Sequence, residues 1–116
     1  PAQKVELYRR IAGIRTLDDQ QDVIEEMIDR FGDPPEPAMN LVHIAYFKAL
    51  ASAVGISSVL QRKNEWVLRF DSSARVVQAL QDNPEQAVLS AGDPPSLLFK
   101  GPGGMDRARR FLERIT

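Results

Sequence analysis

The chain has 116 residues, enough for one small domain with one hydrophobic core. Its apolar fraction of 43% and charged fraction of 27% are ordinary for a folded globular protein and argue against wholesale disorder. The absence of cysteine excludes disulfides, thiolate metal sites and cysteine nucleophiles. A net charge of −1 argues against a general nucleic-acid-binding protein.

Neither a membrane span nor a signal peptide is indicated. The longest apolar stretch, Leu41 to Val54, is interrupted by His43 and Lys48 and is too short to cross a bilayer. The first residues lack the apolar core of a signal peptide. We therefore expect a soluble, cytoplasmic protein without membrane contact. Because the chain begins with Pro1 rather than Met and ends where its last helical pattern stops, we expect one domain of a longer protein.

Three helical patterns occupy the first half of the chain. The first covers about Gln3 to Ile14 and has these apolar residues at helical spacing: Val5, Tyr8, Ile11 and Ala12. Thr16 can cap a second helix that runs to about Phe31, and Gly32 follows as the expected stop.

The segment DPPEP must be a stiff connector, because proline lacks an amide donor and restricts the residue before it. A third helix is predicted over about Pro37 to Val54. It is apolar around most of its circumference, which predicts a buried central helix.

The second half has the short alternating runs of β-structure. We expect a first pair of strands, Ile56 to Arg62 and Glu65 to Asp71, around a Lys63-Asn64 turn. A short helix should follow from Ser72 or Ser73 to Leu80. A second pair of strands, Ala87 to Ser90 and Ser96 to Lys100, should then lead through a Gly101 to Gly104 loop into a final helix. Three helices followed by ββαββα predict an α+β fold with a four-stranded, mainly antiparallel sheet and helices on one face. We expect a single domain, residues 1–116, with a helical region at residues 1–55 and a β-rich region at residues 56–116.

No catalytic constellation can be assembled from these residues. The only histidine, His43, lies in the apolar third helix, where it is more typical of a structural residue than of a ligand or base. The glycine-rich loop before the last helix lacks the Lys-Ser/Thr pair of a phosphate-binding loop, and Asp106 would repel an anion. The acidic residues of the second helix do not have calcium-loop spacing. We predict no enzyme, no cofactor and no metal site in this chain.

The second helix separates into an apolar side and an acidic side. The acidic side comprises Asp22, Glu25, Glu26 and Asp29, with Asp33 just beyond the end. Between residues 17 and 36, eight acids stand against one base, a net charge of −7. A solvated face is the ordinary interpretation. Solvated faces normally mix signs, however, and like charges three or four residues apart repel by a few tenths of a kcal/mol. A basic partner is therefore the functional alternative.

The last helix carries an opposite pattern. Arg107, Arg110 and Arg114 follow i, i+3, i+7 spacing, and from residue 100 onward five bases stand against two acids, a net charge of +3. These arginines either form a solvated face or contact phosphate or an acidic partner. Since no aromatic residue is interleaved with them, base stacking on a single strand has little support.

Three segments in the first half form one longer pattern: LYRRIAGIRT (Leu7 to Thr16), EMIDRFGDPPEPA (Glu26 to Ala38) and LVHIAYFKALASAVGI (Leu41 to Ile56). An acidic helix ends in Asp-Arg-Phe-Gly, and a proline-rich connector leads to an apolar helix that ends in Gly-Ile. This pattern resembles the C-terminal domain of the bacterial transcription-repair coupling factors, the Mfd family. Beyond Ser57 the similarity rests on the order of the elements and on the basic residues of the last helix.

The resemblance implies a regulatory role without catalysis. In that family a separate ATPase motor displaces stalled RNA polymerase, while the C-terminal domain docks on an N-terminal UvrB-like module and masks the surface that recruits UvrA. Carried over by position, the contacts are Glu26 and Asp29, which would pair with arginines of the masked module, with Asp22, Glu25 and Asp33 as weaker candidates. The isolated domain is expected to be a monomer that meets UvrA, RNA polymerase and DNA only through the full-length protein.

Overall fold

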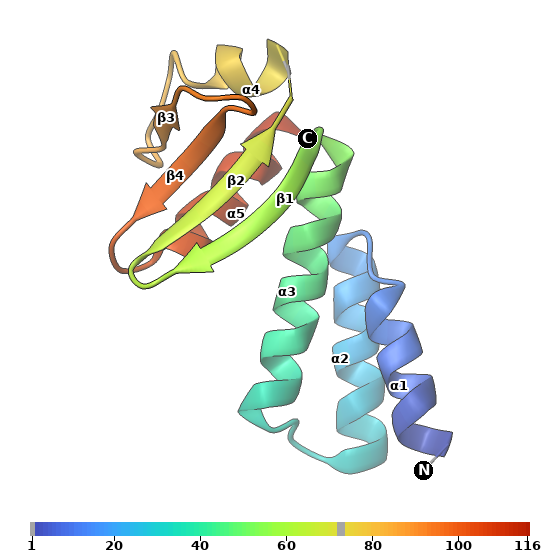
Figure 1. Cartoon of the computed structure of the whole chain (residues 1–116). Helices are drawn as coiled ribbons and strands as arrows, with labels where there is room; N and C mark the ends of the chain where they lie inside the picture. The colour runs from blue at the N-terminus through green and yellow to red at the C-terminus, as the bar shows by residue number, and fades with distance from the viewer. Residues whose placement is uncertain (1, 72–73) are drawn as a thin grey trace. The chain divides into compact units, whose positions relative to one another are not determined.

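The computed structural model describes residues 2–71 and 74–116 (Figure 1). Its elements follow the predicted order, with these bounds: α1 Ala2–Ala12, α2 Leu17–Phe31, α3 Glu36–Ala53, β1 Ile56–Arg62, β2 Glu65–Phe70, α4 Ala74–Ala79, β3 Val88–Ser90, β4 Ser96–Lys100 and α5 Gly104–Ile115. The α+β class is confirmed. By its internal contacts the chain divides into two compact units, the first running to Ala49 and the second from Leu50 to Thr116, so that α3 contributes to both. The single-domain expectation stays a prediction.

In the first unit, α2 begins and ends where the sequence predicts. The Oγ1 of Thr16 accepts a hydrogen bond from the amide of Asp19 at 3.1 Å, and the Asp19 carboxylate accepts one from the amide of Thr16 at 3.2 Å. This reciprocal capping box satisfies amide donors that the first turn of a helix leaves without partners. At the other end Gly32 has a φ of 77°, a conformation that favours glycine.

The core of the first unit is smaller than the apolar pattern predicts. Buried side chains come from all three helices and from the connection between α1 and α2: Ile11, Ile14, Val23, Met27, Val42, Tyr46 and Phe47. Val5 and Tyr8 stand at helical spacing with the buried Ile11, yet they are 57% and 55% exposed. The prediction that α3 is buried nearly all round was wrong at Leu41, which is 43% exposed. The reason is that the apolar stripes of these helices are longer than the surfaces they bury against one another.

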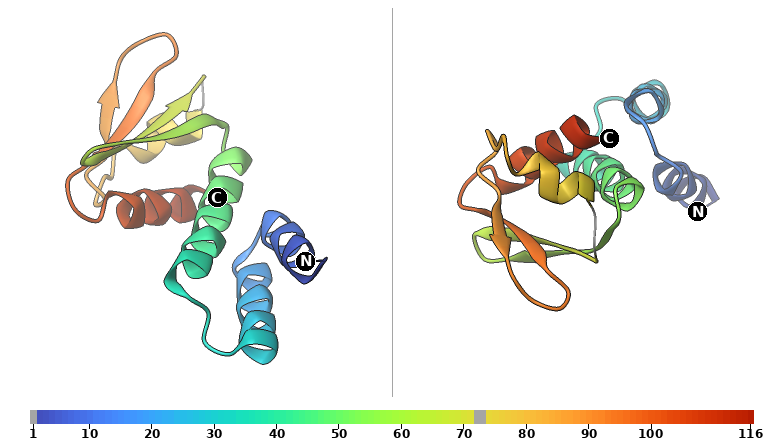
Figure 2. Two further views of the ribbon diagram at one scale, coloured as in Figure 1. Left: turned by 60° about the horizontal axis from the view of Figure 1, so that its bottom comes forward. Right: turned by 90° about the horizontal axis from the view of Figure 1, so that it is seen from above.

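The second unit is built on a four-stranded sheet in the order β1-β2-β4-β3, and all three neighbouring pairs are antiparallel. One row across the sheet pairs Trp66 with Phe99. Helix α5 lies along that face of the sheet (Figures 1 and 2), and the rings of Phe99 and Phe111 meet edge to face at 5.8 Å. A Cβ added at Gly104 would come within 2.8 Å of the Phe99 carbonyl oxygen, so glycine permits this close approach.

The turns of the sheet agree with the sequence. The predicted Lys63-Asn64 turn joins β1 to β2, with a φ of 26° at Lys63. The amide of Gly101 donates to the Asn64 carbonyl at 2.6 Å and so ties this turn to the end of β4. The Asp93-Pro94 peptide, between β3 and β4, is cis. Ser72 and Ser73, the predicted caps of α4, lie outside the described residues.

Candidate protein interface on α2

Helix α2 presents its acidic side to solvent. Val23 and Met27 are 4% and 2% exposed and fix the opposite side of the helix in the core of the first unit. Four of the five predicted acidic residues are exposed: Asp22, Glu25, Asp29 and Asp33. The exposed acidic strip, as we call these four side chains, therefore comprises three residues on the exposed side of α2 and Asp33 just beyond the end of the helix.

Glu26 differs from the other four. Its side chain is only 22% exposed, and its carboxylate pairs with Arg10 of α1 and, at 3.2 Å, with Arg30 one helical turn further along α2. Glu26 thus joins α1 to α2 and draws both cations to one carboxylate. Sequence reasoning missed the role of Arg10, because no spacing rule relates residues on two different helices.

Asp29, the other residue predicted for the interface, is an open carboxylate. It is exposed, and in the portion of the chain that the structure describes it makes neither an ion pair nor a hydrogen bond. Glu25 accepts a weak hydrogen bond from Gln21 at 3.3 Å, one turn before it on the same exposed side. The structure therefore brings Glu26 and Asp29 onto neighbouring turns but gives them different surroundings, one paired within the domain and one open to solvent.

The arginines of α5 are engaged with their own chain. Arg107 donates to the backbone carbonyls of Glu85, at 3.0 Å, and Lys100. Arg114 donates two hydrogen bonds to the Glu85 carboxylate, at 2.9 and 2.8 Å. Arg110 alone is well exposed, and it pairs with Asp106 at 3.2 Å. Arg107 and Arg114, two of the three arginines predicted to contact a partner, thus hold the segment after α4 against α5.

Glu85 is a buried charge with a matched partner. It is 8% exposed, the one polar residue in the core among the described residues. The hydrogen bonds from Arg114 hold the pKa of its carboxyl below the usual value, although burial alone would raise that pKa. The same contact raises the pKa of Arg114, whose guanidinium also lies 5.1 Å from the centre of the Phe111 ring. Sequence reasoning missed Glu85, since it stands in an irregular segment with no periodic neighbours.

Other kinds of site have no support in the ranges that the structure covers. Within residues 2–71 and 74–116, no three histidine, aspartate or glutamate side chains come together in a way that could hold a metal ion. No helix in these ranges has the length and apolar character required to cross a membrane.

Comparison with known proteins shows which family this chain is similar to. A family model described as the TRCF domain matches residues 1–80. The chain is 31% identical over 114 residues to the transcription-repair-coupling factor of Escherichia coli (strain K12). The aligned region covers 97% of this chain and 9% of that protein. It is also 31% identical over 72 residues to the transcription-repair-coupling factor of Bacillus subtilis (strain 168), with 62% of this chain and 6% of that protein covered.

The fold has a match among solved structures. The crystal structure of the C-terminal domain of transcription-repair coupling factor superposes with a TM-score of 0.80 at 21% identity, over 99% of this chain and 81% of that one. At this identity the likeness shows a shared fold. The chain spans less than a tenth of the length of the curated relatives it matches, at 9% and 6%.

Proposed function

Because this chain belongs to the TRCF domain family, we propose that it is a non-catalytic, autoinhibitory interaction domain of a transcription-repair coupling factor. In this proposal the domain docks on the N-terminal UvrB-like module of its parent protein. Docking masks the surface that binds UvrA until the parent engages stalled RNA polymerase. The ATPase motor that moves the parent along DNA belongs to another region of that protein.

The observation that carries the proposal is the exposed acidic strip on α2. Asp22, Glu25, Asp29 and Asp33 form a one-signed surface that α2 itself does not neutralise. A basic surface that recognises UvrA would be complementary to such a strip, and charge complementarity favours one partner and one orientation over others. A single rim pair would contribute about 0.2 to 1 kcal/mol, so specificity must come from the strip acting together.

The two central carboxylates have different tasks in this proposal. Asp29 is the direct contact, because it is exposed and open. Glu26 is first a positioning residue, because it already pairs with Arg10 and Arg30. An arginine of the masked module reaches Glu26 only by sharing or replacing one of these partners. Asp29 is therefore the residue that tests docking without disturbing the joint between α1 and α2.

The experiment is to replace Asp29 by arginine in the full-length parent protein and to measure UvrA binding. We expect UvrA to bind more tightly, because reversed charge repels the basic module and opens the masked surface. Asp93→Arg is the matched control, since Asp93 is also exposed but lies outside α2 in the second unit. Unchanged UvrA binding by Asp29→Arg, with the domain still folded by circular dichroism, would show that this face does not mask UvrA recognition.

The alternative function, contact with nucleic acid through Arg107, Arg110 and Arg114, is less well supported by the geometry. Two of these side chains donate to groups of the same chain. Arg110 remains exposed, but a single cation beside Asp106 gives little attraction for phosphate. A strong salt dependence of DNA binding by the domain, reduced in Arg110→Ala, would revive this alternative.

A further inference from the structure

The sheet of the second unit has one face that α4 and α5 leave open. Helix α5 packs on the face that carries Trp66 and Phe99, and α4 packs against α5 on the same side (Figures 1 and 2). The contact between Glu85 and Arg114 holds the segment after α4 on that side as well. Successive side chains of a strand point to opposite faces, so the residues between those covered ones belong to the open face.

An apolar row crosses all four strands on the open face. The register pairs Leu60 of β1 with Val67 of β2. It also pairs Leu98 of β4 with Val67 on one side and with Val88 of β3 on the other. The ends of the row are exposed, Leu60 by 38% and Val88 by 44%, while Val67 in its middle is 5% exposed. The solvated face of an antiparallel sheet is normally polar, so a continuous apolar row there is typical of a binding surface.

Cations border this row on both sides. Each lies two residues beyond a member of the row on its own strand and therefore on the same face: Arg62 on β1, Arg69 on β2 and Lys100 on β4. Because β2 is antiparallel to both of its neighbours, Arg69 lies on one side of the row, and Arg62 and Lys100 lie on the other. Glu65 stands between Arg62 and Lys100. Among the strand residues of this face, three bases thus stand against one acid, a net charge of +2.

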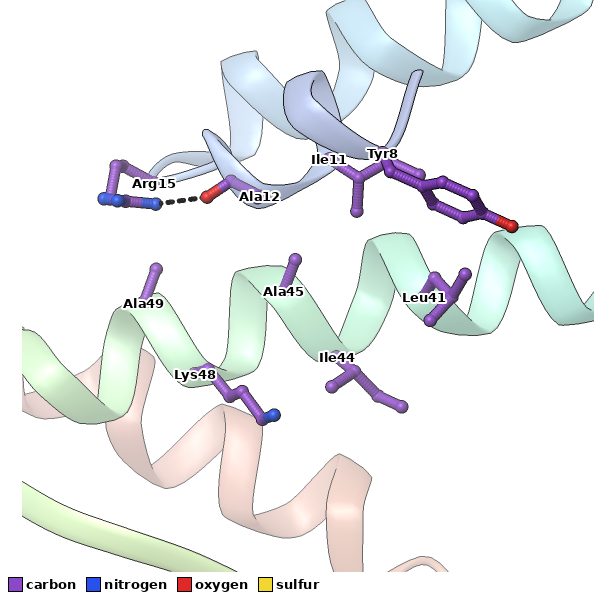
Figure 3. A pocket seen from close by; sticks show the side chains of 9 residues that line it. All are labelled: Tyr8, Ile11, Ala12, Arg15, Leu41, Ile44, Ala45, Lys48 and Ala49. Atoms are coloured by element: carbon purple, nitrogen blue, oxygen red, sulfur yellow. Dashed lines mark hydrogen bonds between the residues drawn. The ribbon is translucent and has the colours of Figure 1, made fainter. Parts of the chain in front are cut away.

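The largest apolar groove of the first unit lacks such an arrangement of charge. It lies between α1 and α3 and encloses about 420 Å³. Figure 3 shows Lys48 on the side of α3 that is turned away from α1, and Arg15 donates to the carbonyls of Ala12 and Ile14 at 2.9 and 2.8 Å. The two cations of that groove therefore do not face a common occupant, whereas those of the open sheet face border one apolar row.

We propose that the open face binds an amphipathic helix of a partner protein, laid along the apolar row with carboxylates on both flanks of its apolar stripe. The row covers three strand spacings, roughly 14 Å. That length corresponds to about nine residues of helix, which suits apolar anchors at i, i+3 or i+4, and i+7. The cations stand about 7 Å to either side of the row, within reach of glutamates on a helix about 10 Å wide.

The charge of the open face favours this occupant over two others. A second copy of the same face would bring cations against cations, and like charges across an interface are costly. A single nucleic-acid strand would require aromatic side chains for stacking, and the described strand residues of this face include none. The partner has the opposite charge to the one that the acidic strip attracts, so this is a second docking surface.

A displayed library of three-turn helices tests the proposal with the 116-residue chain. All members carry one apolar stripe, and the positions beside it are Glu, Gln or Lys. The counter-selection target is Val88→Lys, which adds a charge at an exposed end of the row, on an edge strand that tolerates lysine. We expect helices flanked by Glu to be enriched over those flanked by Lys. No enrichment over the Val88→Lys chain, or equal enrichment of both flanks, would overturn the proposal.

Fluorescence anisotropy with one enriched peptide then locates the contact through two matched pairs of variants. Val88→Lys should weaken binding about tenfold, while Val77→Lys, at a valine of α4 that is 51% exposed, should leave it unchanged. Arg69→Glu should weaken binding about five- to tenfold, and Arg75→Glu, at an exposed arginine of α4, is its control. Equal binding within either pair, with all four variants folded by circular dichroism, contradicts the proposal.

The same variants separate the other occupants. A dimer in sedimentation velocity that Val88→Lys abolishes would assign the face to a second copy, and stronger competition by single-stranded DNA than by the Gln-flanked helix would assign it to nucleic acid. Either result overturns the proposal. Asp29→Arg should bind the peptide like the unmodified chain, so failure here and failure of the masking proposal can be told apart.

Discussion

The acidic side of α2 and the basic side of α5 look equivalent as sequence but differ as structure. Each shows like charges at helical spacing opposite an apolar stripe. On α5, Arg107 and Arg114 donate to groups in the segment around Glu85 and at the end of β4. On and just after α2, four of the five carboxylates predicted for the interface are exposed to solvent. A run of like charges therefore identifies a docking surface only after its hydrogen-bond partners within the chain have been counted.

The difference has a physical cause in the side chains themselves. An arginine carries five N–H donors on a long stem, and a folded chain offers backbone carbonyls that can accept them. An ionised aspartate only accepts hydrogen bonds, and its short side chain reaches few donors outside a helix N-terminus. Arginines near a domain's own loops are thus easily absorbed into its structure, whereas aspartates in mid-helix stay available to a partner.

The largest expected effect is on the α5 side. Arg114→Ala should lower the free energy of unfolding by about 2 kcal/mol, because it leaves the buried Glu85 carboxylate without its partner. This is below the range for a wholly buried pair, since the Arg114 side chain is 30% exposed. Urea unfolding measures the change, and Arg110→Ala, which removes an exposed pair, is the control. Equal loss in both variants would mean that Glu85 is not held as described.

The pH dependence of stability sharpens the same point. Because the folded-state pKa of Glu85 lies below the unfolded value of 4.5, the carboxylate stabilises the fold above that value, and this contribution is lost as the pH falls through the folded-state pKa. We expect the difference in unfolding free energy between the unmodified chain and Arg114→Ala to shrink as the pH falls below the unfolded value of 4.5. A difference that stays constant as the pH falls would exclude the ion pair as its source.

A smaller effect is expected where α1 meets α2. Arg10→Ala removes one of the two cations at Glu26, and the pair is partly exposed, so the loss of stability should be about 0.5 to 1 kcal/mol. Thermal unfolding at low and high salt measures it, and the loss should be smaller at high salt because ions screen the pair. A loss that does not depend on salt would point to packing of the Arg10 stem instead.

The smallest effect is expected at Asp29. Replacing it by asparagine should change the unfolding free energy by less than about 0.5 kcal/mol, because it is an exposed residue with no described partner. A slight gain is the expected sign, since one repulsion among like charges on α2 disappears. Chemical unfolding of both chains measures the difference. Loss of more than about 1 kcal/mol would show that Asp29 is structural, and its proposed contact role would lose its basis.

The sequence predicts the fold well because its signals are local. Thr16 and Gly32 mark the ends of α2 by rules that act over a few residues, and the Lys63-Asn64 turn marks the first hairpin in the same way. The failures concern contacts between distant segments. Exposure of Tyr8 depends on how far α3 covers α1, which periodicity within α1 does not reveal.

For the candidate site too, features within one helix could be predicted, whereas contacts between distant segments could not. Helical spacing correctly groups the acidic residues of α2 on one side, and four of them are exposed. Spacing carries no information about Arg10, which pairs with Glu26 from another helix, or about Glu85, which pairs with Arg114 over 29 residues. A pattern within one helix can therefore nominate a surface, but the partners of its charges depend on the tertiary fold.

The position of Arg114 has a practical consequence for handling this domain. The residue stands in the last turn of α5, where a helix end ordinarily frays and tolerates trimming, yet here that turn clamps the segment after α4 through Glu85. A version shortened before Arg114, or one with a bulky fusion placed directly after Ile115, would disturb the second unit of the chain. Purification tags and fluorescent labels belong after a flexible spacer, and the same last turn is a sensitive place to attach a probe of folding.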